Sequence, residues 1–120
     1  MKLVLVAFAG AAGAVARYRI GLAVGVRSFP WATTGINLTG SFLLGLVLTM
    51  GIERGWPETT TIPLAVGFLG AYTTFSTFSF ETYTLLRTDR AAAALAYVAV
   101  SVVGGVFAAA MGYVTARALA

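Results

Sequence analysis

Hydroxyl and phenyl side chains alternate in one otherwise apolar stretch, GFLGAYTTFSTFSFETY (residues 67–83). Five hydroxyl groups fall within residues 72–77, and in a helix Phe75 and Phe78 share one face because they are three residues apart. The hydroxyls beside that face include Ser76 and Thr77. Neutral donors and the positive edges of phenyl rings attract a small anion without holding it too tightly to leave. The stretch therefore predicts part of a pore wall for a small anion.

Other neutral polar side chains are expected on neighbouring helices. Asn37 carries the only side-chain amide in the sequence, and Tyr97 and Ser101 are four residues apart, which places them on one helical face. Hydrogen bonding between helices is the ordinary explanation for a single Ser, Thr or Asn in a membrane protein. A whole stripe, with an amide and paired phenylalanines, instead favours a polar track along an ion path.

The composition indicates an integral membrane protein. Hydrophobic residues make up 59% of the 120 positions and charged residues only 10%, whereas about a quarter of the residues in a soluble domain are charged. The mean hydropathy is +0.90, and the charges separate apolar runs of roughly the 20 residues that cross a bilayer as a helix. The net charge of +4 comes from arginines expected at helix ends, where they reach lipid headgroups, so nucleic acid is not an expected partner.

Catalytic chemistry is not expected. The chain has no cysteine, no histidine and four acidic residues. These leave no plausible set of groups for acid–base catalysis and no metal cluster built from side chains. The protein is therefore not expected to be an enzyme.

We expect one domain, residues 1–120, with four transmembrane helices that pass the membrane at about 2–26, 31–52, 60–86 and 91–119. The connections are short, so consecutive helices are expected to be antiparallel neighbours. Lys2 and the apolar, small residues that follow it also fit a signal peptide. Apolar sequence resumes beyond Arg17 and Arg19, however, which gives a segment long enough to span, so we expect this segment to remain uncleaved.

The third helix is expected to be broken in mid-membrane. Gly67 and Gly70 precede the hydroxyl-rich stretch, and glycine weakens a helix. Unwound backbone at membrane depth is tolerated only where it is buried in protein or lines a cavity. A break there frees carbonyl groups to coordinate a cation and leaves a helix N-terminus that favours an anion.

The basic residues predict insertion in both orientations. With four spans, one side of the membrane receives three basic residues and the other receives three to five, depending on where Arg17 and Arg19 reach. So small a difference orients a chain only weakly. Four small helices also enclose a hydrated path poorly on their own. An antiparallel, dual-topology homodimer satisfies both observations.

Three motifs follow one another along the chain: GAVARY (13–18), GINLTGSFLLG (35–45) and GFLGAYTTFSTF (67–78). In order and spacing they resemble the signatures of the bacterial fluoride channels, the Fluc or CrcB family. The four-span length agrees, so the resemblance covers essentially the whole chain. The family often has a Gly-Gly pair before the threonines, where this chain has Ala71 and Tyr72.

The resemblance implies an antiparallel homodimer in the bacterial inner (plasma) membrane that protects cells by exporting fluoride passively through two pores. Phe75 and Phe78 would line the pores, with Asn37 as an amide donor near them. Arg17 matches an arginine near the aqueous vestibule. The residues that match the polar track of the fourth helix are Tyr97 and Ser101.

The resemblance also implies one bound cation. Backbone carbonyls of Gly70 and Thr73 would bind a central structural Na⁺, two from each subunit. Because the ligands are backbone groups, this site depends on the conformation of the broken third helix.

Two other functions fit a small four-span protein. A dual-topology multidrug or cation transporter needs a carboxylate embedded in the membrane, typically in the first helix, but no acidic residue precedes Glu53, and Glu81 lies near the end of the third span. A structural subunit without a transport path leaves the polar stripe without a purpose. Ion-selective efflux from proteoliposomes separates all three.

Overall fold

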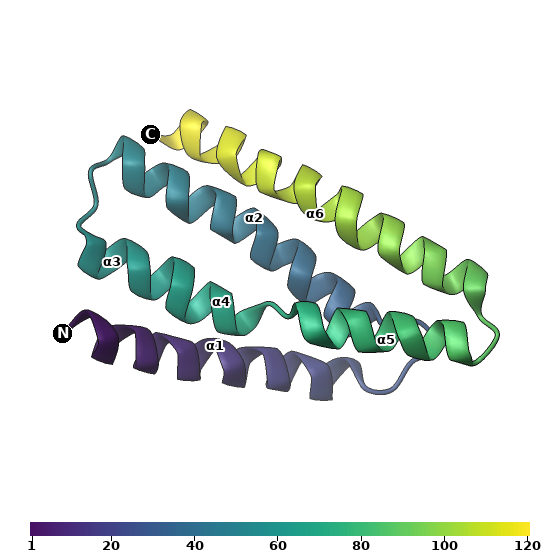
Figure 1. Ribbon diagram of the computed structural model, residues 1–120. Helices are drawn as coiled ribbons and strands as arrows, with labels where there is room; N and C mark the ends of the chain where they lie inside the picture. Colours follow the sequence, from purple (N-terminus) through teal and green to yellow (C-terminus); the bar gives the residue numbers. More distant parts are fainter.

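The computed structural model describes all 120 residues, and its regular structure is entirely helical (Figure 1). The three long helices are α1 (Lys2–Val24), α2 (Trp31–Glu53) and α6 (Ala91–Leu119). Between α2 and α6 the chain forms α3 (Glu58–Ile62), the π-helix η1 (Pro63–Leu69), α4 (Gly70–Tyr72) and α5 (Phe75–Arg87). We call these four pieces the third rod. The expected all-helical architecture with a broken third helix is confirmed.

The molecule thus has four rods: α1, α2, the third rod and α6. Each rod runs antiparallel to the next one in sequence, and both termini lie at the same end of the molecule (Figure 1). α2 packs along α6, whereas α1 packs along η1 and α4. α5 packs on α6 instead. The third rod therefore changes partners near its middle, which is where its helix is interrupted.

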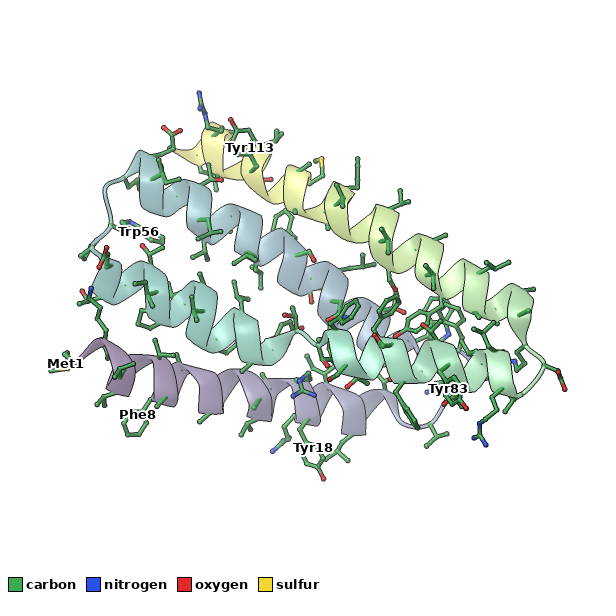
Figure 2. The ribbon with its side chains drawn as sticks, viewed as in Figure 1. Met1, Phe8, Tyr18, Trp56, Tyr83 and Tyr113 are labelled. Carbon is green, nitrogen blue, oxygen red and sulfur yellow. The ribbon has the colours of Figure 1, made fainter.

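Most side chains face outward, as expected of a protein whose solvent is lipid. Only 17 of the 120 residues are buried, and α1, α2 and α6 are each long and apolar enough to cross a membrane. Phe8 and Tyr18 on α1 are exposed and point away from the other helices (Figure 2), and Tyr113 on α6 is also exposed. The third rod is not a fourth helix of this kind because its longest piece, α5, has 13 residues, fewer than the roughly 17 that a spanning helix needs.

Glycine brings the rods into backbone contact. A Cβ atom on Gly13 of α1 would lie 2.1 Å from the carbonyl oxygen of Phe68 in η1. A Cβ atom on Gly112 of α6 would lie 2.0 Å from the carbonyl oxygen of Phe42 in α2. These positions exclude any side chain, so the two glycines set the spacing of the rods, as small residues do between membrane helices.

Helix ends lie within two residues of the expected spans. The third rod begins at Glu58 instead of residue 60, and the first helix stops at Val24 instead of residue 26. Gly25 has a φ of +70°, which a right-handed helix cannot contain, and it therefore ends α1.

Candidate functional site

The third rod is interrupted at two threonines. Thr73 (φ −86°, ψ 158°) and Thr74 (φ −150°, ψ 120°) are extended and separate α4 from α5. The sequence located the break nearer to Gly67 and Gly70, but Gly67 lies inside η1 and Gly70 has helical angles (φ −63°, ψ −37°). Threonine is β-branched and adopts extended backbone readily. The interruption therefore arises from the threonine pair and its contacts, and not from glycine flexibility.

Asn37 of α2 pairs with the extended segment as a neighbouring strand would. Its Oδ1 accepts a hydrogen bond from the backbone N–H of Thr74 at 2.9 Å, and its Nδ2 donates to the carbonyl oxygen of the same residue at 3.0 Å. The bond to the N–H replaces a helical hydrogen bond that the interruption removes, and lipid offers no substitute. Nδ2 has a second N–H, which makes no hydrogen bond within the chain and is available as a donor.

The start of α5 is capped by Thr74. Its Oγ1 accepts a hydrogen bond from the backbone N–H of Thr77 at 3.2 Å, and the two side-chain hydroxyls lie 3.0 Å apart. A capped helix N-terminus carries partial positive charge, which favours an anion nearby. The interruption thus creates a helix end beside the predicted pore wall.

A cavity of about 310 Å³ opens beside the interruption, and we call it the break cavity. It brings together side chains from α2, the third rod and α6. Six of the predicted site residues line it, namely Asn37, Gly70, Thr73, Phe75, Phe78 and Ser101. None of its 13 lining residues is charged. The cavity therefore offers neutral donors and ring edges, a combination that suits a small anion.

The two phenylalanines occupy different depths of the break cavity. The ring centroids of Phe75 and Phe78 lie 5.9 Å apart, and Phe78 meets Tyr97 edge to face at 5.0 Å. Phe78 is half-buried, whereas Phe75 is 79% exposed. Phe75 therefore stands at an open rim, and the chain by itself does not close the cavity on that side.

Ser101 contributes a hydroxyl without a partner. Its Oγ is buried and makes no hydrogen bond within the protein. Buried polar atoms almost always have a partner, because leaving one unpaired costs roughly 1–3 kcal/mol. On the wall of a cavity, such a hydroxyl is free to bind an ion or water.

Glu81 of α5 is a site residue that the sequence analysis did not assign. Its Oε1 accepts a hydrogen bond from Thr33 of α2 at 2.7 Å, and its Oε2 accepts one from the Tyr97 hydroxyl at 2.9 Å. Tyr97 is fully buried, so it lies behind Phe78 and not on the wall of the break cavity. A sequence signal for Glu81 existed: it follows Phe78 by three residues and Thr77 by four, which places it on the predicted pore face.

A second cavity, of about 450 Å³, continues beyond the interruption. Thr77, Arg17 and Glu81 line it, and Thr74 lines both cavities. Ser76 lines neither; its Oγ lies 3.4 Å from Oγ1 of Thr74. The polar side chains predicted as one track are thus divided between two cavities that share a wall at Thr74.

Comparison with known proteins now decides the family. The family model described as "CrcB-like protein, Camphor Resistance (CrcB)" matches residues 4–113. The chain belongs to the CrcB-like family. Similar curated relatives include the "Fluoride-specific ion channel FluC" of Hahella chejuensis, 45% identical over 120 residues that cover 96% of this chain and 94% of the relative. Proteins of the same name from Hydrogenovibrio crunogenus (41% identical, 98% and 92% covered) and Idiomarina loihiensis (46%, 92% and 90%) are also similar.

Membership of the CrcB-like family confirms the resemblance carried by the three sequence motifs. The matched range contains every residue that lines the break cavity and the second cavity. With its apolar helices, the chain is a multi-pass membrane protein of this family.

Proposed function

We propose that this chain is a fluoride-specific ion channel of the cell membrane, through which fluoride leaves passively down its gradient. Relatives that match it over nearly the whole length bear that name. The observation on this chain that carries the proposal is the uncharged break cavity, lined by Asn37, Phe75, Phe78 and Ser101. Selectivity would follow from size and hydration, because a narrow path excludes larger ions and close neutral donors replace part of the water around a small one.

The donors of the proposed path are neutral. The second N–H of Asn37 and the unpaired hydroxyl of Ser101 provide two hydrogen-bond donors on the same cavity. The ring edges of Phe75 and Phe78 add weaker positive potential. Each interaction is modest, so an ion that has entered can also leave.

We further propose that the functional unit is an antiparallel homodimer with two pores, each chain forming one domain with four spans. The break cavity is open at Phe75, whose ring is 79% exposed. A second copy seated on this side would close the cavity and cover that ring. The balanced distribution of basic residues supports insertion of the two copies in opposite orientations.

A structural Na⁺ at the interruption fits the groups present, and we propose that backbone carbonyls of Gly70 and Thr73 hold it. No side chain of this protein donates a hydrogen bond to either carbonyl. The space beside Gly70 is open, since a Cβ atom there would meet only the carbonyl oxygen of Ala65, at 3.8 Å. Two carbonyls give incomplete coordination, so the second copy would supply two more. The ion would offset the partial negative charge of the carbonyls at this helix end.

Ion-selective efflux tests the channel proposal. Purified protein in liposomes should release fluoride down its gradient, while chloride release stays at the level of protein-free liposomes. Replacing Na⁺ with a large organic cation throughout purification should lower the fluoride rate and weaken the dimer. Chloride release comparable to fluoride release would contradict a fluoride-specific channel, and fluoride uptake that requires a proton gradient would favour a transporter built around Glu81.

A further inference from the structure

Arg17 of α1 contacts the third rod beside the interruption. Its Nε donates a hydrogen bond to the carbonyl oxygen of Ala71, in α4, at 3.1 Å. Ala71 belongs to the last helical turn before the break, where carbonyl groups lose their helical partners. Arg17 is half-buried and forms no ion pair, since the only salt bridges of the chain are Lys2–Glu58 and Arg117–Glu53.

We propose that Arg17 is a positioning residue for the ion path, and that its hydrogen bond to Ala71 fixes the end of α4. This proposal deepens the fluoride-channel function and rests on it. The role differs from that of a charge in an aqueous vestibule, which would attract anions without contacting the backbone. Here the donor atom matters more than the charge.

The geometry favours a bracing role because two helices hold the two sides of one short segment. Arg17, from α1, binds the carbonyl of Ala71, and Asn37, from α2, binds the N–H and carbonyl of Thr74. Thr73 lies between these anchors and has the extended backbone that turns the chain. The Arg17 hydrogen bond gives the carbonyl group of Ala71 the partner that the interruption removes, and lipid offers no substitute. Releasing the Ala71 anchor would let Thr73 and the following Phe75 move relative to the break cavity.

Three substitutions at one position separate the donor from the charge. Arg17→Gln places an amide N–H at the same bond separation from Cα as Nε, and it removes the charge. Arg17→Met has a methyl group at that point and lacks both. Arg17→Lys keeps the charge but puts a methylene where Nε was. Arg19, exposed on the same helix and without a hydrogen bond, provides matched control substitutions.

We expect Arg17→Gln to keep most of the wild-type fluoride efflux from liposomes. Arg17→Met should lower it by roughly tenfold or more, the effect of losing a hydrogen bond from a charged donor, and Arg17→Lys should fall clearly below Arg17→Gln. Arg19→Gln and Arg19→Met should both conduct as wild type. Wild-type efflux with Arg17→Met, or a higher rate in Arg17→Lys than in Arg17→Gln, would overturn the proposal in favour of a vestibule charge.

Hydrogen exchange of the purified protein shows whether Arg17 fixes the end of α4, and this measurement does not depend on fluoride. Amides of residues 72–78 should exchange faster in Arg17→Met than in wild type, and at the wild-type rate in Arg17→Gln, while amides of α6 stay unchanged in both. Unchanged exchange at residues 72–78 in Arg17→Met would also overturn the proposal. If Arg17→Met does not fold, the comparison of fluoride efflux between Arg17→Gln and Arg17→Lys still tests the proposal. If the wild-type protein releases no fluoride, the channel function is refuted. The exchange rates of residues 72–78 then still test whether Arg17 fixes the end of α4.

Discussion

Substitution of Gly13 measures how closely α1 and the third rod must approach. The Cβ atom of an alanine there would lie 2.1 Å from the carbonyl oxygen of Phe68, 3.0 Å from its carbonyl carbon and 3.1 Å from its Cα. Ordinary contact begins at 3.4 Å, so Gly13→Ala must move α1 and η1 apart by about 1.3 Å at the carbonyl oxygen. All three atoms are backbone, and no change of side-chain rotamer relieves the overlap.

We expect Gly13→Ala to lower the free energy of unfolding by roughly 2–3 kcal/mol, the upper part of the range for overpacked positions. Gly21→Ala in the same helix is the matched control, because nothing lies within 4 Å of the added Cβ atom. Alanine favours a helix over glycine by up to about 1 kcal/mol, so this control should be as stable as wild type or more stable. Fluoride efflux should also fall in Gly13→Ala, since η1 leads directly into Gly70 and the break cavity.

Unfolding in mixed detergent micelles, followed through the fluorescence of Trp31 and Trp56, gives the free energy for each variant. Trp56 lies in the connection between α2 and α3 (Figure 2), where loss of packing changes its surroundings. Equal stability of Gly13→Ala and Gly21→Ala would refute the backbone contact between α1 and η1. Lower stability with unchanged efflux would separate the packing of α1 from the geometry of the break.

Three more predictions concern the pore, the ion pair near the N-terminus and the orientation. Phe75→Ile and Phe78→Ile should each lower fluoride efflux roughly fivefold, the rate equivalent of an aromatic-edge interaction of about 1 kcal/mol, while the protein elutes as wild type in size-exclusion chromatography. Normal efflux in both variants would remove the role given to the rings. The hydrogen bond and positive charge of Lys2 lower the pKa of Glu58 from its usual 4.5, so this pair stabilises the fold above that pH and the contribution is lost as the pH falls below it. Glu58→Gln should therefore be less stable than wild type at neutral pH, and the difference should shrink as the pH falls below 4.5, in the same unfolding assay. A difference that grows on acidification would contradict the assignment. A cysteine placed in the turn at residues 87–90 should react with impermeant reagents from both sides of the membrane, and labelling from one side only would exclude dual topology.

The sequence was sufficient to predict the broken third helix and the pair of phenylalanines beside it, because both leave local signals. Phe75 and Phe78 have helical spacing, and hydroxyls interrupt an apolar run. The position of the break was not predictable in this way. It depends on Asn37, which is 37 residues from Thr74 in sequence and meets it only because α2 lies beside the third rod.

Two further features depend on packing that no local pattern reveals. The binding of Glu81 by hydroxyls from α2 and α6 joins three helices, so it emerges only when all three are placed. The π-helix η1 has the sequence PLAVGFL, which is ordinary for a membrane helix. Its wider turns lie where Gly13 of α1 contacts the backbone of Phe68 in η1. This contact forms between helices and therefore leaves no signal in the local sequence.

The division of the third rod into short pieces bears on how the protein enters the membrane. No piece is long enough to cross a bilayer alone, and the extended Thr73–Thr74 backbone has polar groups that lipid cannot satisfy. Asn37 of α2 binds the backbone of Thr74 and Arg17 of α1 binds the carbonyl oxygen of Ala71, and both side chains are synthesised before the third rod. The third rod is therefore suited to insertion against a pair of helices already in the bilayer, and not as an independent segment. A chain synthesised without α1 would present the carbonyl group of Ala71 to lipid without its Arg17 partner.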